Sequence, residues 1–269
     1  MLLRIILIAF GAAVIGSLVG GLIGVIIKKP SKNYISLMLG FAAGAMLGAS
    51  VFELLPESFE YGGIWALLGG VALGVGFVFL VNLLRRGEDS DVVGKVLEDY
   101  AVKVCENSPD GQVCKNAVAA SDKHKLKKMG VTIFIAMALH SLPEGLAIGA
   151  GEFLGIGLLL GIVFFLHFVP EGLAIAVPMR ASGTKPWKIL LFCAVAGLPA
   201  VAGAILAYFI GTTDVVLALC LSFAAGAMIY VSLSDMLPTA YNYSTHYKAL
   251  GAVVLAGVLL MIVFGALLH

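Results

Sequence analysis

Apolar segments long enough to cross a lipid bilayer recur along the whole chain, and they limit its possible folds more than any other feature. Of the 269 residues, 61% are hydrophobic and only 12% are charged. A soluble domain carries about 25% charged residues, and a transmembrane helix needs about 20 mainly apolar residues in a row. The sequence therefore predicts an all-α, polytopic membrane protein that is embedded in a lipid bilayer.

Charged and proline-containing breaks divide the chain into eight predicted transmembrane helices. These helices cover residues 3–27, 34–56, 62–84, 130–150, 154–179, 187–210, 214–238 and 247–268. The remaining long segment has ordinary soluble composition and no run long enough to span, so we expect it to form a loop. The predicted regions are thus helices one to three in 1–84, the loop 85–129, helices four and five in 130–179, and helices six to eight in 180–269.

Basic residues are distributed unevenly between the predicted loops. Every lysine and arginine except Arg4 falls in alternate loops, most of them in 85–129. Because cytoplasmic loops carry the excess of positive charge, these loops are predicted to be cytosolic and both termini extracytoplasmic, in a plasma or inner membrane. The net charge of +1 and the lack of a basic patch interleaved with aromatic residues argue against a nucleic-acid partner.

The sequence repeats itself twice. Residues 139–150 and 166–177 agree at eight of twelve positions, and residues 41–56 and 223–238 agree at nine of sixteen. With eight spans, helices four and five run in opposite directions, and so do helices two and seven. Both pairs are then related by inversion in the membrane, which is typical of transporters whose site is exposed to each side in turn.

Four ionisable residues inside the predicted spans form the strongest candidate site. His140 precedes Glu144 by four residues, and His167 precedes Glu171 by four, so each pair shares one helix face. Burying such groups is costly unless they are paired or line a cavity. One divalent cation would satisfy all four, and two nitrogens with two oxygens suit tetrahedral Zn²⁺, or else Fe²⁺, Mn²⁺ or Cd²⁺. The alternative is two hydrogen-bonded His–Glu pairs that brace the helices without a metal.

Two prolines lie beside these residues. Pro143 and Pro170 have no N–H to donate, and their rings crowd the carbonyl four residues earlier. We expect the helices to bend or unwind there, with Gly145 and Gly172 easing the distortion.

Further candidates outside this set have weaker support. Met46, in the first FAAGAM, would either lend a thioether to the site or simply pack. Glu53 and Asp235, at matching positions of the second repeat, would form a metal entrance or bracing pairs near the membrane surface. Possible metal ligands in the loop 85–129, at a spacing that is not a zinc signature, are Cys105, Cys114 and His124.

With LHSLPEG at 139–145, FLHFVPEGLAIA at 165–176 and two FAAGAM motifs, the chain resembles prokaryotic members of the ZIP (Zrt/Irt-like) family of metal transporters. The resemblance covers the whole predicted membrane region. It implies a moving bundle of helices one, four, five and six that carries the metal, beside a static, dimerising scaffold of helices two, three, seven and eight. It also places Met46 where a scaffold methionine approaches the metal, and it implies a homodimer.

The chain departs from the commoner pattern of that family, in which a second metal is held beside the first. The positions concerned carry Ser141, Phe168 and Ala200, none of which is a strong ligand. The resemblance therefore implies one metal at a time, from a family that moves zinc, iron, manganese and cadmium.

The predicted function is uptake of divalent transition-metal cations, zinc above all, into the cytoplasm by alternating access. A passive divalent-cation channel is the main alternative. An intramembrane metal-dependent hydrolase is a weaker one, because the chain has two intramembrane histidines, no H-E-x-x-H and no spare carboxylate beside them. We therefore expect no enzymatic activity.

Overall fold

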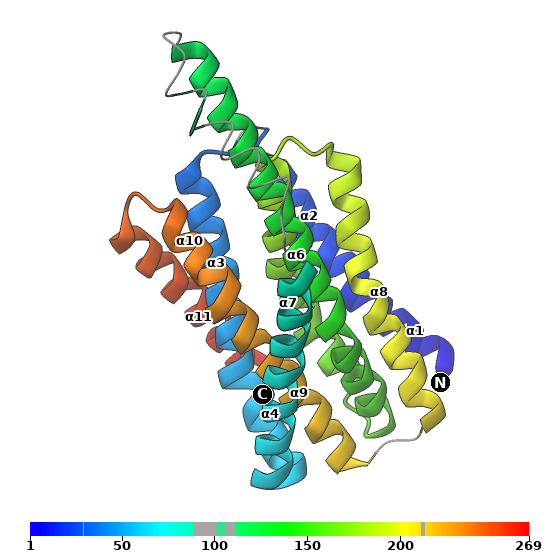
Figure 1. Cartoon of the computed structure of the whole chain (residues 1–269). Coiled ribbons are helices and arrows are strands. Elements are labelled where there is room, and N and C mark those ends of the chain that lie inside the picture. Colours follow the sequence, from blue (N-terminus) through cyan, green and yellow to red (C-terminus); the bar gives the residue numbers. More distant parts are fainter. Residues whose placement is uncertain (29, 89–101, 104, 106–110, 211–212, 269) are drawn as a thin grey trace.

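The computed structural model describes residues 1–28, 30–88, 102–103, 105, 111–210 and 213–268. These residues are helical and include no β-strand, which confirms the predicted all-α class. Short π-helical turns, labelled η, interrupt the α-helices. The elements in chain order are α1 (Leu2–Ala9), η1 (Phe10–Ile15), α2 (Gly16–Val25), α3 (Lys32–Ala49), η2 (Ser50–Leu54), α4 (Leu55–Glu88), α6 (Gly111–Phe153), α7 (Gly157–Ala181), α8 (Pro186–Ile210), α9 (Asp214–Val231), η3 (Ser232–Met236), α10 (Leu237–Tyr243) and α11 (Tyr247–Leu268) (Figure 1).

Seven helical segments of the described chain are long and apolar enough to cross a membrane. One of them, Lys32–Leu83, contains two of the predicted spans, and each of the others contains one. This segment has 52 residues. As one straight helix it would be about 78 Å long, whereas the hydrocarbon core of a bilayer is about 30 Å thick.

The segment Lys32–Leu83 folds back on itself at Gly63. The backbone there has φ 66° and ψ −173°, a conformation that glycine adopts without steric cost. Before the turn the chain runs opposite to α9, and after the turn it runs parallel to α9. The contacts that establish these directions are the hydrogen bonds Ser36–Ala240 and Ser58–Ala218 before the turn, and the ring contacts Phe77–Phe223 and Phe79–Tyr230 after it.

The helices associate as four parallel pairs held together by small residues. The pairs are α2 with α7, α6 with α8, α3 with α11, and α4 with α9. In the third pair, a Cβ added at Gly44 would collide with the carbonyl oxygen of Val254. Small residues let neighbouring membrane helices approach until their backbones touch, which is the main source of packing energy in a lipid environment.

The parallel pairs reproduce the inverted repeats of the sequence. The inversion that superimposes helix four on helix five also superimposes the pair α6/α8 on the pair α7/α2. The inversion that superimposes helix two on helix seven likewise superimposes α3/α11 on α9/α4. The related helices run in opposite directions: along α6 and α7, for example, Gly130 lies beside Met179 and Gly151 beside Leu160. The predicted inverted-repeat architecture is therefore confirmed.

Two of the π-helical turns occupy matching positions in the two copies of one repeat, residues 41–56 and 223–238. Ser50–Leu54 and Ser232–Met236 each end directly before a Leu-Pro dipeptide. Because proline has no N–H for the carbonyl four residues earlier, a regular helical turn cannot form there, and the backbone widens instead.

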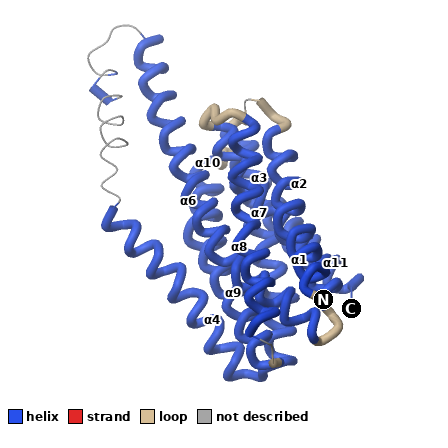
Figure 2. The backbone as a smooth tube through the Cα atoms, turned by 90° about the vertical axis from the view of Figure 1, so that its right-hand side faces the viewer, coloured by secondary structure: helices blue, strands red, loops and turns tan. Residues whose placement is uncertain are grey.

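Both chain termini lie towards one end of the helix bundle, and the first half of α6 extends beyond the other end (Figure 2). Residues 111–129, which the sequence analysis assigned to the loop, already form the first turns of α6. Residues 89–101, 104 and 106–110 of the predicted loop lie outside the described residues. An extension of an existing helix is favoured because each added residue gains a hydrogen bond without a new nucleation step.

Candidate metal centre

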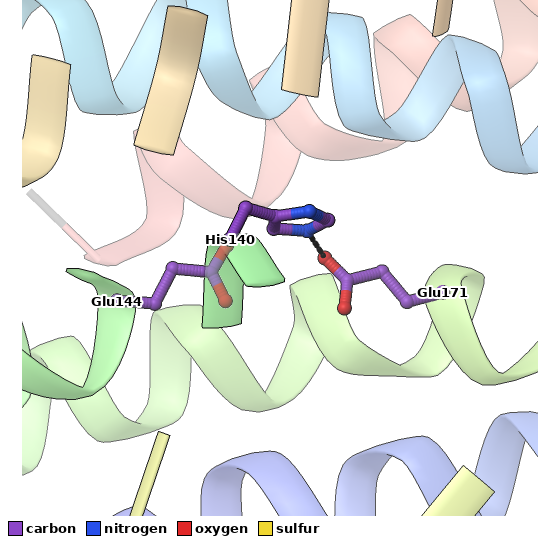
Figure 3. A group of neighbouring side chains, drawn as sticks. All are labelled: His140, Glu144 and Glu171. Carbon is purple, nitrogen blue, oxygen red and sulfur yellow. Dashed lines mark hydrogen bonds and ion pairs between the residues drawn. The ribbon is translucent and has the colours of Figure 1, made fainter. Parts of the chain in front are cut away.

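Three of the four predicted ligands meet in the core of the bundle. His140 and Glu144 lie one turn apart on α6, and Glu171 comes from the antiparallel α7. One ligand atom from each residue lies within 4.8 Å of those of the other two, and all three side chains are buried. The imidazole of His140 lies between the two carboxyl groups (Figure 3). The inverted repeat thus brings residues of two helices to one point.

Hydrogen bonding determines the protonation of the His140 ring. Its Nδ1 donates to the carbonyl oxygen of Ala136 at 2.9 Å, and a carbonyl can only accept. A neutral ring therefore carries a lone pair on Nε2, which lies 3.1 Å from Oε1 of Glu171. Two lone pairs at this separation repel each other unless a proton or a cation lies between them. This Nδ1–H···O=C arrangement is the usual way to orient a histidine whose other nitrogen binds a metal.

Glu144 contributes a buried carboxyl group to the site. Its side chain is fully buried, and neither carboxyl oxygen has a hydrogen-bond partner among the described residues. Burying a carboxylate anion without a partner costs several kcal/mol of free energy, so a nearby positive charge or hydrogen-bond donor is expected to compensate. A cation next to the His140–Glu171 pair would supply that compensation.

His167 has the same local arrangement but lies outside the three-residue group. Its Nδ1 donates to the carbonyl oxygen of Val163 at 3.0 Å, so the lone pair again lies on Nε2. That nitrogen is buried and has no partner among the described residues. His167 lies one turn before Glu171 on α7, and its unpartnered nitrogen is a candidate for a fourth ligand.

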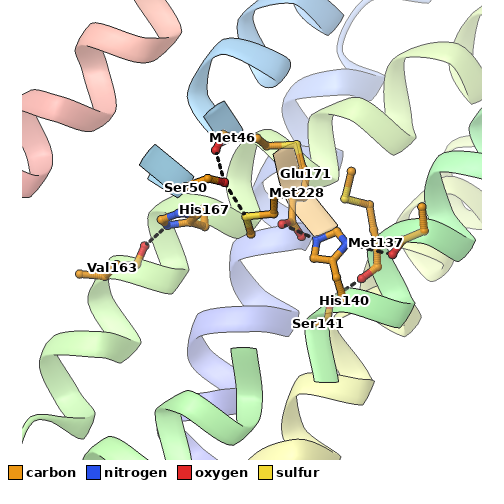
Figure 4. A network of polar contacts seen from close by, with 10 residues as sticks. Met46, Ser50, Met137, His140, Ser141, Val163, His167, Glu171 and Met228 are labelled. Atoms are coloured by element: carbon orange, nitrogen blue, oxygen red, sulfur yellow. Dashed lines mark hydrogen bonds and ion pairs between the residues drawn. The ribbon is translucent and has the colours of Figure 1, made fainter. Parts of the chain in front are cut away.

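Methionine and serine residues from the repeat formed by 41–56 and 223–238 lie next to the His and Glu side chains of the site (Figure 4). Met46 and Met228 are both buried. The hydroxyl of Ser50 donates to the Met46 carbonyl at 2.8 Å and approaches the Met228 sulfur at 3.5 Å. Met46 was predicted from the sequence as a candidate ligand. Met228 was not, although it occupies the same position in the second FAAGAM.

Of the expectation that the helices bend or unwind at the prolines, the unwinding was wrong. Both α6 and α7 remain helical through Pro143 and Pro170. The adjacent glycines have another role, because a Cβ at Gly145 would collide with the backbone of Ala200, and a Cβ at Gly172 with the carbonyl of Ser17. Each ligand helix is therefore packed against its parallel partner at the residue directly after the glutamate.

The weaker candidates are not part of this group. Glu53 is buried, and its Oε2 has no hydrogen-bond partner in the described part of the chain. Asp235 lines a separate cavity of about 300 Å³ together with Lys125 and Lys128. Cys105 is disulfide-bonded, so the prediction of a free Cys105 thiolate as a metal ligand is wrong. The side chain of Cys114 lies outside the described residues.

Comparisons with known proteins find relatives along nearly the whole chain. The family described as ZIP Zinc transporter matches residues 3–265. The zinc transporter ZupT of Corynebacterium glutamicum is 33% identical over 264 residues, covering 91% of this chain and 93% of the relative. The protein of the same name from Chlorobaculum parvum is 32% identical, covering 96% of both chains. The one from Campylobacter jejuni is 33% identical, covering 90% of this chain and 89% of the relative.

These matches extend over nearly the whole chain, and not only over the repeated motifs. They confirm the predicted family, and the relatives are named as transporters and not as enzymes. The buried His and Glu side chains accordingly lie in a multi-span membrane protein whose relatives move metal. The chain belongs to the ZIP family of zinc transporters.

Proposed function

We propose that the protein carries divalent transition-metal ions, zinc above all, into the cytoplasm by alternating access, with His140, Glu144, His167 and Glu171 as the ligands. The observation that carries the proposal is the unpartnered, fully buried carboxyl group of Glu144 beside the His140–Glu171 pair. Two imidazole nitrogens and two carboxylate oxygens suit tetrahedral Zn²⁺. The names of the relatives support zinc, while Fe²⁺, Mn²⁺ and Cd²⁺ fit the same ligands.

Met46 is proposed as an additional, thioether ligand. It is buried next to the site, on a helix of the other inverted repeat. A ligand from α3 would join the ion to helices outside α6 and α7, and it would be released when the two groups of helices move apart.

The site is proposed to hold one ion. The hydroxyl of Ser141 donates back to the Met137 carbonyl at 2.6 Å, Phe168 is buried in the apolar core, and Ala200 packs its backbone against Gly145. These three positions, where many relatives bind a second metal, are thus occupied by packing contacts.

The topology supports a carrier in the cell membrane. The turn at Gly63 and the placement of both termini towards one end of the bundle support eight crossings. The basic residues in alternate loops support extracytoplasmic termini. The inverted repeats support alternating access, since inversion allows one fold to present its site to either side. A homodimer is proposed on the family resemblance alone.

Uptake of ⁶⁵Zn²⁺ into proteoliposomes tests the proposal. We expect saturable uptake by the unmodified protein and its loss in Glu144→Gln. The matched control is Glu60→Gln, which removes the same charge at an exposed position and is expected to retain uptake. Near-normal uptake by Glu144→Gln would refute the site, and linear, non-saturating uptake by the unmodified protein would favour a channel.

A further inference from the structure

A second cavity, of about 420 Å³, lies at the end of the bundle opposite the termini. It is bounded by α6, by the turn between α7 and α8, and by the start of α8; this turn is yellow-green at the top of Figure 1. It shares no residue with the metal centre.

The cavity is strongly basic. Lys127 reaches it from α6, Lys185 from the turn and Lys188 from α8. No acidic residue is among the described residues that line it, and none of the three ammonium groups has an ion pair within the described chain. Asp122, one turn and a half before Lys127 on α6, is paired with Lys32 at 3.3 Å. Three cations around one hollow repel each other and favour an anion between them.

Hydroxyl groups complete the polar lining. The turn passes through Gly183 at φ 88° and places Ser182 and Thr184 at the cavity. The two hydroxyls lie 2.9 Å apart, and that of Ser182 also donates to the Met179 carbonyl at 2.7 Å. The backbone N–H groups of Gly183 and Thr184 already donate within the turn. With Ser182 donating to Met179, the Thr184 hydroxyl donates to Ser182, so an anion would be bound by the side chains of the lysines.

The other wall of the cavity is apolar and lies near the start of the apolar segment that forms α8. Val131 and Phe192 line it, one turn or more inside the spans of α6 and α8. Trp187, beside the cavity at the start of α8, is 60% exposed, and the Lys188 ammonium lies 5.5 Å from its ring centre. Tryptophan is enriched where helices leave the hydrocarbon for the headgroup region. The cavity thus offers cations at headgroup level and apolar surface beneath them.

We propose that this cavity binds the phosphate of an anionic phospholipid headgroup, with the acyl chains along α6 and α8. Lysines bind phosphate as compact point charges, and basic pockets between transmembrane helices are suited to anionic lipids. The negative charge of the lipid reduces the repulsion among the three lysines and holds the α7–α8 turn against α6. This proposal is independent of metal transport, because it involves none of the metal ligands.

Thermal unfolding of the purified full-length protein in neutral detergent tests the proposal. Phosphatidylglycerol, phosphatidylcholine and inorganic phosphate are added separately, and the apparent affinity is obtained from the shift in Tm. The test variant is Lys127→Gln/Lys185→Gln/Lys188→Gln. The control variant, Lys28→Gln/Lys123→Gln/Lys248→Gln, removes the same total charge from exposed lysines outside the cavity.

We expect phosphatidylglycerol, but not phosphatidylcholine, to raise the Tm of the unmodified protein and of the control variant. The test variant should bind phosphatidylglycerol at least about tenfold more weakly, since each lysine near an anionic lipid contributes about a fivefold effect. An equal response of the two triple variants would show attraction by general surface charge and overturn the site. An equal Tm shift with inorganic phosphate at the same concentration would show that the cavity binds free phosphate and would overturn the proposal of a lipid headgroup. Native mass spectrometry, which counts retained lipids, gives the same comparison if the test variant has an altered Tm.

Discussion

The Nε2 atom of His140 and the Oε1 atom of Glu171 lie 3.1 Å apart, on two antiparallel helices that an internal inversion relates to each other. Because the Nδ1 atom of His140 donates to a carbonyl, the short distance requires a proton or a metal ion between nitrogen and oxygen. With these residues as ligands, a divalent ion that is loaded would replace the proton between them.

Glu144→Met is expected to stabilise the metal-free protein while it abolishes metal binding. Methionine has a similar volume and removes a buried carboxyl group that has no partner, which should raise the unfolding free energy by about 1–3 kcal/mol. The measurement is thermal unfolding in the presence of a chelator. A loss of stability would mean that Glu144 braces the helices, as in the alternative without a metal.

His167→Ala is expected to weaken zinc binding by about tenfold or more, because it removes one of the four proposed ligand atoms. Isothermal titration of purified protein measures the change. Unaltered affinity would limit the ligands to the three residues whose atoms already converge, and His167 would then be a packing residue.

One tight intramembrane ion is expected for each chain. The positions of Ser141, Phe168 and Ala200 offer packing contacts in place of a second set of ligands. Zinc titration followed by native mass spectrometry gives the stoichiometry directly. Two ions that are both lost in Glu144→Gln would contradict a mononuclear centre.

Metal affinity is expected to fall as the pH is lowered. Each ion that enters must displace the proton between His140 and Glu171, so protons and metal compete, and the apparent affinity should fall about tenfold for each pH unit and displaced proton. The proper readout is zinc binding by purified protein, since transport also responds to a pH gradient. A flat profile between about pH 5.5 and 7.5 would contradict the displacement of a proton.

Gly145→Ala is expected to destabilise the protein by about 1–3 kcal/mol and to impair metal binding, because the new Cβ meets the Ala200 backbone and displaces α6. The control is Gly11→Ala, where a Cβ would meet nothing within 4 Å. Equal stability of the two variants in thermal unfolding would show that the close contact between α6 and α8 is dispensable.

Much of the fold could be predicted from the sequence. The spans depend on local composition, and the repeats around His140 and His167 are long enough to detect by direct comparison. The i, i+4 spacing also predicted which ligands share a helix face, and the structure places Glu144 and His140 accordingly.

The rest depends on contacts between distant segments. Nothing near Met228 distinguishes it from a packing residue except its position in the repeat. The prolines, considered alone, predicted bent or unwound helices, but both helices stay wound, and Gly145 and Gly172 pack closely against neighbouring backbones there. The polar start of α6 has no apolar periodicity, so only its continuity with the buried half of the helix reveals it.

The division into parallel pairs has a consequence for movement. His140 and Glu144 belong to the α6/α8 pair, whereas His167 and Glu171 belong to the α2/α7 pair. With the proposed ligands, an ion held by both pairs would add a direct link between them, so we expect a loaded carrier to shift these four helices as one body against α3, α4, α9 and α11. Once the cargo leaves, that link is lost, and the two pairs retain only their helix packing and the short contact between His140 and Glu171.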